Sequence, residues 1–221
     1  MLRRVTVVLG RATRWLLDAL APRRCACCDG VSDSAVCERC TGVLTTMRAS
    51  PPRRLRHGSA YAGWEFEDPV RHAIHRGKFG GDRDGLRTLS GVAWQRVAAR
   101  ASMTWPVAAA VPVPLGPRRR RQRGYNQAEI IAACVAEQSG MPVVTHLVRT
   151  RDTPPQSSHD EAARRRNVDA AFAWHGGRVD GATLLLVDDV LTTGATLSAA
   201  SAALVAAGAR RVDAFVIAAV P

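Results

Sequence analysis

Residues 184–197 read LLLVDDVLTTGATL, and this stretch decides the fold. Its four leading apolar residues predict a short strand buried on both faces, and two acids follow at the carboxyl end of that strand. A loop of small and hydroxyl residues comes next, and an Ala-rich helical pattern begins at residue 195. This order is typical of an open α/β sheet, in which ligands bind just beyond the carboxyl ends of the strands.

The residues after the strand indicate a site for a phosphorylated sugar. Residues 192–196 would place backbone N–H groups at a helix N-terminus, where the helix dipole favours a phosphate, and Gly194 would let the backbone approach it. Asp188 and Asp189 repel a phosphate but suit sugar hydroxyls or a hydrated Mg²⁺ beside it. The alternative is an ordinary strand–loop–helix junction without a ligand, and the complete run is more specific than an acid pair alone.

The run resembles the phosphoribosyl-pyrophosphate (PRPP) motif of type I phosphoribosyltransferases. The resemblance implies that the two acids hold the ribose 2′- and 3′-hydroxyls and that the small-residue loop wraps the 5′-phosphate. The residues it assigns to PRPP binding are Val187, Asp188, Asp189, Thr192, Thr193, Gly194, Ala195 and Thr196.

Composition and charge favour a polyanionic partner. The 221 residues, 47% of them hydrophobic, suffice for one α/β domain with a small appendage. The net charge of +12 suits nucleic acid or a pyrophosphate-bearing metabolite. A GC-rich genome is a competing explanation, because Lys78 is the only lysine among 31 basic Lys and Arg residues. In a chain that otherwise uses arginine, the single lysine indicates that position 78 has a role that arginine cannot fill.

Four cysteines have the spacing of a zinc site. Cys25-x-x-Cys28 and Cys37-x-x-Cys40 form two knuckles, each of which can aim two thiolates at one metal ion. Four thiolates leave no open coordination position, so the zinc is expected to be structural. The alternatives are disulfides, which a reducing compartment disfavours, and a thiol redox pair. Cys27 is a spare that could replace a ligand.

The pattern along the chain predicts two domains. Residues 1–50 are expected to hold an N-terminal helix and the zinc finger, residues 51–221 the α/β domain, and residues 41–59 a linker. Asp68 is interpreted as the N-cap of a helix that ends before a Gly-rich loop at residues 78–82. The polar segment 149–167 is expected to be a flexible lid. The strands expected in a doubly wound sheet are residues 60–66, 107–113, 142–148, 170–174, 183–187 and 212–220.

The first 20 residues predict neither a signal peptide nor a membrane span, because Arg11 and Arg14 interrupt the apolar run. Trp15, Leu16 and Leu17 are expected to lie on a short amphipathic helix that docks onto the domain. The protein is therefore expected to be cytoplasmic.

An arginine run follows the strand expected at residues 107–113. It contains Arg118, Arg119, Arg120, Arg121 and Arg123. Three interpretations stay open: a solvated loop that reflects composition, a pyrophosphate-binding loop at the strand's carboxyl end, and a groove for nucleic acid. In the third, Arg118 to Arg121 contact the nucleic acid and Tyr125 stacks on a base, although an aromatic content of 5% disfavours a stacking platform.

Nearly the whole chain resembles the ComF family, which is associated with competence and DNA uptake. The resemblance rests on the two cysteine knuckles, KFGG at 78–81, VPVP at 111–114, RGYNQAE at 123–129, Gln156, Arg166-x-Val168 and the PRPP motif. It implies a type I phosphoribosyltransferase-like fold, in which helices flank a parallel sheet, with a small N-terminal zinc-finger subdomain. It further implies a pyrophosphate loop at residues 112–127, and a flexible catalytic loop at residues 149–167 that carries Arg166.

Two functions of different classes follow from the resemblance. In the first, the protein transfers the phosphoribosyl group of PRPP, with Mg²⁺, to an unknown acceptor. The residues expected to act in it are Asp188, Asp189, Lys78, Arg123 and Arg166. Enzymes that act on 6-oxopurines carry an acid where this chain has Thr192, which disfavours those acceptors. In the second, the protein is a non-catalytic module that keeps the pocket and binds single-stranded DNA or competence proteins. Amidophosphoribosyl transfer is disfavoured because no cysteine follows Met1.

Overall fold

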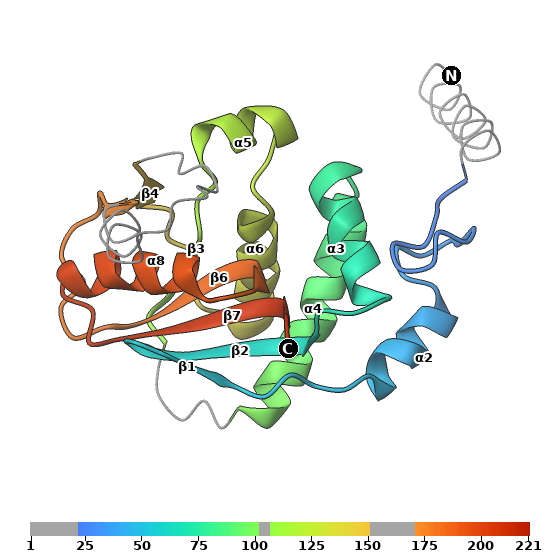
Figure 1. The fold of residues 1–221 in the computed structure, drawn as a ribbon, viewed down its shortest axis with the longest axis horizontal. Coiled ribbons are helices and arrows are strands. Elements are labelled where there is room, and N and C mark those ends of the chain that lie inside the picture. The colour runs from blue at the N-terminus through green and yellow to red at the C-terminus, as the bar shows by residue number, and fades with distance from the viewer. Residues whose placement is uncertain (1–21, 102–106, 151–170) are drawn as a thin grey trace, which may run out of the picture.

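The computed structural model describes residues 22–101, 107–150 and 171–221 and contains one central sheet with the strand order β1-β2-β7-β6-β3. Strands β2, β7, β6 and β3 are parallel, and β1 pairs antiparallel with β2 at the edge. The strands are β1 (Arg53–Leu55), β2 (Gly58–Glu65), β3 (Ala109–Pro112), β6 (Thr183–Leu191) and β7 (Arg211–Ala219). Figure 1 shows helices on both faces of this sheet, which confirms the predicted α/β class.

The helices bury opposite faces of the same apolar strands. Helices α4 (Arg83–Arg100) and α6 (Gln127–Ser139) cover one face, α3 (Val70–Phe79) packs on α4, and α8 (Ala195–Ala206) covers the other face (Figure 1). Along β6, Leu185 and Val187 belong to the core on the α4 and α6 side, whereas Leu184 and Leu186 belong to the core on the α8 side. Successive side chains of a strand point to opposite faces of the sheet. Because helices cover both faces here, the strands need apolar residues at consecutive positions.

The strand predicted at residues 142–148 is wrong as a member of the central sheet. In that interval one isolated bridge joins Val143 to Ala110. Strand β4 (Leu147–Arg149) instead pairs antiparallel with β5 (Phe172–Trp174) in a separate two-stranded sheet, so the strand predicted at residues 170–174 is also wrong as a member of the central sheet. An apolar pattern does not specify a partner, because strand pairing depends on which segments packing brings together.

The N-terminal segment shares a core with the α/β domain. The interval predicted as a linker, residues 41–59, instead contains the end of helix α2 (Glu38–Thr46) and all of β1. Cys25, Cys40 and Leu44 are buried in the same cluster as Ile74 of α3. The indole Nε1 of Trp64 donates a hydrogen bond to the carbonyl oxygen of Leu44 at 2.9 Å. The interval is ordered by burial against α3, α4 and β2 rather than by a local signal.

Helix α3 starts later and ends later than the sequence predicts. Pro69 occupies the N-cap position, and the carboxylate of Asp68 accepts hydrogen bonds from Arg71 instead of capping the helix. The helix continues through Phe79, so Lys78 lies in its last turn and not in a loop. A cation in this turn interacts favourably with the helix dipole.

The predicted N-terminal helix, Arg166 and most of the segment 149–167 lie outside the described residues. Within the part of the chain that the structure describes, no helix combines the length and the apolar character that crossing a membrane requires.

Candidate functional site

The acid pair lies at the carboxyl edge of the central sheet. Strand β6 continues through both acids to Leu191, whereas β3 ends with Pro112 paired to Val187. The acids therefore start where the neighbouring strand stops. Because side chains alternate along a strand, Asp188 lies on the face covered by α8 and Asp189 on the face toward α3.

The single lysine of the chain reaches this acid pair. Lys78 Nζ lies 2.7 Å from Asp189 Oδ1, and the two side chains are 19% and 11% exposed. At this distance and burial the contact is a charge-assisted hydrogen bond that solvent screens only partly. The structure thus brings together Lys78 and Asp189, which the sequence separates widely.

Asp188 has an unusual acidity. Burial and the charge of Asp189 raise the pKa of Asp188 to about 7, against the opposing effects of the Asp189 N–H, Lys78 and Arg149. The N–H of Asp189 donates to Asp188 Oδ1 at 2.9 Å. Arg149 is the last residue of β4 and the first residue of the segment expected to form the catalytic loop, and its charge acts on Asp188.

The loop after β6 leads directly into α8. Gly194 has φ of 81° and occupies the N-cap position, where a left-handed backbone favours glycine. Glycine has no side chain with which to cap the helix, and the first-turn N–H group of Ala195 donates instead to Thr193 Oγ1 at 3.4 Å, a long contact that a phosphate could replace. Arg53 of β1 donates hydrogen bonds to the carbonyl oxygens of Thr192, at 3.2 Å, and Val220. The sequence offers no signal for Arg53, since one arginine among so many is not distinctive.

The two cations predicted to act near pyrophosphate line one cavity of about 490 Å³. The guanidinium of Arg123 lies 5.0 Å from the centre of the Phe79 ring, and its Nη1 donates to Gln127 Oε1 at 3.0 Å. Phe79 is 70% exposed. The residues that line the cavity are Lys78, Phe79, Gly80, Gly81, Arg119, Gln122, Arg123 and Tyr125.

The arginine run forms helix α5 (Pro117–Arg123), although the sequence predicts a loop. Arg118 to Arg121 are all exposed, and Arg120 pairs with Glu129 at 2.7 Å. Tyr125 is half-buried: its hydroxyl donates to the carbonyl oxygen of Gly77. The guanidinium of Arg83 lies 4.4 Å from the centre of the Tyr125 ring. Tyr125 therefore attaches the α5–α6 connection to the end of α3.

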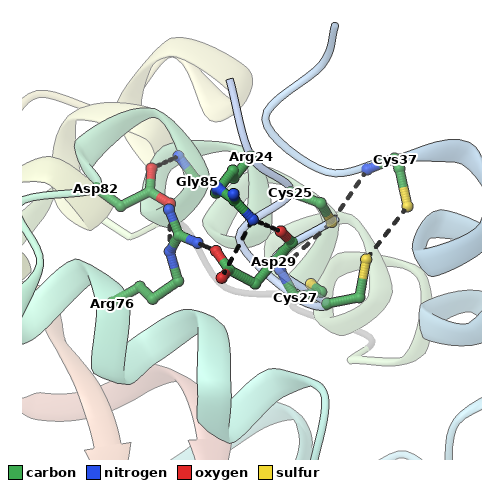
Figure 2. Close-up of polar contacts among 9 residues, drawn as sticks. Arg24, Cys25, Cys27, Asp29, Cys37, Arg76, Asp82 and Gly85 are labelled. Atoms are coloured by element: carbon green, nitrogen blue, oxygen red, sulfur yellow. Dashed lines mark hydrogen bonds and ion pairs between the residues drawn. The ribbon is translucent and has the colours of Figure 1, made fainter. Parts of the chain in front are cut away.

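Four cysteines form a cluster that could bind a zinc ion. The Sγ atoms of Cys25, Cys28, Cys37 and Cys40 all lie within 4.8 Å of one another, and none of these cysteines forms a disulfide. The backbone N–H groups of Cys27 and Cys37 donate to Cys25 Sγ at 3.4 and 3.3 Å (Figure 2). Four sulfur atoms at this spacing fit the tetrahedral coordination of zinc.

The acidities of the cysteines differ in a way that suits a metal site. Burial opposes ionisation of Cys25, but the N–H groups that face its sulfur outweigh it and lower its pKa to about 6. Burial and the neighbouring cysteines raise the pKa of Cys27, which lies outside the cluster, to about 12. The Cys25 thiolate therefore forms readily, whereas burial raises the pKa of Cys40, so metal binding must displace the proton of Cys40.

Comparison with known proteins gives consistent matches. The phosphoribosyl transferase domain family matches residues 123–221. The chain is 28% identical to competence protein ComFC of Bacillus subtilis (strain 168) over 176 residues, which are 79% of this chain and 68% of that protein. It is 30% identical to DNA utilization protein YhgH of Salmonella typhi, over 67% of this chain and 66% of that protein. It is 32% identical to competence protein F of Haemophilus influenzae, over 60% of each. The chain thus spans about two thirds of the length of these relatives.

Proposed function

Since the chain is a ComF-family phosphoribosyltransferase-like protein, we propose that the carboxyl edge of its sheet binds PRPP with Mg²⁺ and transfers the phosphoribosyl group to an acceptor. The observation that carries the proposal is the 2.7 Å contact of Lys78 with Asp189, beside the start of α8. This contact places two carboxylates and a cation beside the N-terminus of α8, at the edge where α/β sheets bind ligands.

Each part of PRPP has a partner in this arrangement. The N–H groups of residues 192–196 hold the 5′-phosphate, and the carboxylates of Asp188 and Asp189 accept hydrogen bonds from the ribose hydroxyls. Lys78 and Arg123, which line one cavity, face the pyrophosphate. Mg²⁺ would be held near the two carboxylates and would neutralise charge on the leaving pyrophosphate. When the bond from C1 to pyrophosphate breaks, positive charge develops on the sugar, and the protein contributes mainly orientation and electrostatic stabilisation.

The direct test is a calorimetric titration of PRPP with Mg²⁺ into the wild-type protein. We expect saturable binding, followed by pyrophosphate release when the correct nucleobase or amine acceptor is added. An absence of any heat of binding across the accessible concentration range would overturn the proposal and favour the DNA-binding function below.

The acidity of Asp188 leads to a pH prediction. Below pH 7 its carboxyl group is largely protonated, and a protonated carboxyl accepts hydrogen bonds from ribose hydroxyls less well. A group that must lose a proton of pKa about 7 weakens binding about tenfold at pH 6 relative to pH 8. We therefore expect PRPP affinity to rise with pH by this factor. In Asp188→Asn the remaining pH dependence should be that of the ligand alone, and an unchanged profile would contradict the assignment.

We propose a structural role for zinc in the four-cysteine cluster. The spacing of the four sulfur atoms and the lowered pKa of Cys25 support this assignment. A cytoplasmic location, which we also propose, would keep these thiols reduced.

The second candidate function is the binding of single-stranded DNA, which the exposed arginines of α5 favour. We expect that charge reversal of residues 118–121 weakens binding of a fluorescent oligonucleotide and lowers the slope of log affinity against log salt. A matched control reverses four exposed arginines elsewhere, namely Arg39, Arg48, Arg54 and Arg56. If both variants lose affinity for the oligonucleotide equally, α5 contributes only to the net charge and does not contact the DNA specifically.

A further inference from the structure

One arginine joins the cysteine cluster to the helix that carries Lys78. Arg76 lies in the last turn of α3, two positions before the lysine. Its Nη1 pairs with Asp29 Oδ1, and its Nε lies 3.3 Å from Asp82 Oδ2. Figure 2 shows the guanidinium between these two carboxylates, with the cysteine cluster beyond Asp29. The Arg76 side chain is only 28% exposed, so the pair is partly shielded from solvent.

The position of Asp29 is set by the cysteine knuckle. Asp29 directly follows Cys28 and has φ of 59°, in the left-handed region. Its N–H donates to the carbonyl oxygen of Cys25 at 2.9 Å, and the N–H of Cys25 donates to that of Gly30 at 2.8 Å. The same turn that aims Cys25 and Cys28 at a metal ion therefore holds the Asp29 carboxylate toward α3. A knuckle without its metal loses the constraint that keeps this turn closed.

On its other side Arg76 is attached to the start of α4. Asp82 is the N-cap of α4, where its Oδ1 accepts a hydrogen bond from the N–H of Gly85 at 2.8 Å. A Cβ atom on Gly85 would lie 2.4 Å from the Cβ of Ala26, so the knuckle and the first turn of α4 are in direct contact. The carbonyl oxygen of Gly77, also near the end of α3, accepts a hydrogen bond from the Tyr125 hydroxyl. The last turn of α3 is thus held between the knuckle and the α5–α6 connection.

We infer that metal occupancy of the four-cysteine cluster sets the position of Lys78 through the Asp29–Arg76 ion pair, so that metal binding and binding at the carboxyl edge of the sheet are coupled. In this account Arg76 is a positioning residue that acts through Lys78. The part that concerns the ligand rests on the proposed function, because PRPP with Mg²⁺ is the probe for that site. Coupling is reciprocal, so zinc must strengthen PRPP binding by the factor by which PRPP strengthens zinc binding.

The first experiment does not depend on PRPP. Because Lys78 is the only lysine, isotope-labelled lysine in a chain without a lysine-containing tag yields one side-chain NMR signal that reports on this residue. We expect that removal of zinc shifts this signal. We expect the same direction of shift in zinc-loaded Asp29→Asn and Arg76→Gln, which keep all four cysteines. Asparagine tolerates the left-handed backbone at position 29, so Asp29→Asn removes the charge and keeps the turn.

The matched control is Arg71→Gln, which removes an exposed ion pair with Asp68 from the same helix. It should leave the Lys78 signal in place. All variants are compared at a zinc content of one per chain, measured by metal analysis, so that unfolding of the knuckle is not mistaken for loss of coupling. A Lys78 signal that stays unchanged in both zinc-loaded variants would overturn the inference.

The second experiment measures the coupling itself. We expect Asp29→Asn and Arg76→Gln to bind PRPP with Mg²⁺ about five- to tenfold more weakly than wild type, near the lower end of typical coupling factors. Competition with a zinc chelator should show PRPP strengthening zinc retention by the same factor in wild type and not in the variants. If wild type, Asp29→Asn and Arg76→Gln bind PRPP with equal affinity, the inferred coupling between the zinc site and PRPP binding is wrong. If the Lys78 signal shifts as expected but the wild type does not bind PRPP, the proposed function is wrong, whereas the effect of the metal on the position of Lys78 is still supported.

Discussion

We expect that replacing Asp188 and Asp189 together with asparagine abolishes the proposed PRPP binding and leaves the fold intact. Each charged hydrogen bond to a ribose hydroxyl is worth about 1.5–3 kcal/mol, so losing both weakens binding by roughly 10²–10⁴-fold. The fold tolerates the change at Asp188 because burial and the charge of Asp189 already disfavour its ionised form. At position 189 the ion pair with Lys78 is lost, but the asparagine amide oxygen can still accept a hydrogen bond from Lys78 Nζ. Calorimetric titration of PRPP with Mg²⁺ measures the loss, and thermal unfolding measures the stability.

The control for the double variant is Asp180→Asn, which makes the same chemical change at an exposed acid paired with Arg178. It should bind PRPP as the wild type does. Double-variant affinity within about threefold of wild type, a change of only about 0.7 kcal/mol, would show that the acids do not hold the ribose. An unfolded double variant is recognised by its melting curve, and Asp189→Asn alone then tests the contact that Lys78 makes.

We expect that replacing Cys28 or Cys40 with serine removes the proposed stoichiometric zinc and lowers the stability of the whole domain. Three thiolates and a hydroxyl bind zinc far more weakly than four thiolates, and zinc binding to such small sites supplies folding free energy. The effect reaches the domain because the knuckle shares its core with α3 and α4. We expect a fall in melting temperature of about 10 °C, which corresponds to several kcal/mol in a domain of this size. Metal analysis of the purified variants and differential scanning calorimetry check both parts.

The control is Cys134→Ser. Cys134 is buried in α6, belongs to no cysteine cluster, and lies within hydrogen-bond distance of Gln138 and the carbonyl oxygen of Arg87. It should keep one zinc per chain. Full retention of zinc in both Cys28→Ser and Cys40→Ser would exclude the four-cysteine site, whereas a change in Cys134→Ser alone would mean that the serine substitution itself disturbs folding.

Local sequence patterns gave wrong predictions for two segments whose secondary structure depends on the distant segments that pack against them. The polar composition and Pro51-Pro52 predict a linker at residues 41–59, yet this interval contains most of α2 and all of β1. The apolar pattern of segment 142–148 predicts a sheet strand, but β3 has β6 as its partner, and among the described residues the edge beyond β3 receives only the Ala110–Val143 bridge. Burial by distant segments outweighed the local signal in both places.

The sequence by itself determined the parallel sheet, the acids at the carboxyl edge and the four clustered cysteines. These follow from apolar runs, from residues adjacent in the chain and from the spacing of the two knuckles, all of which are local properties. Only the tertiary structure decided that Lys78 meets Asp189, that Arg53 holds Thr192 and that Arg76 joins Asp29 to α3. Such contacts depend on how α3 packs against α4 and on where the sheet places β1. In a chain with so many arginines, composition cannot single out the few that these packed elements bring to a partner.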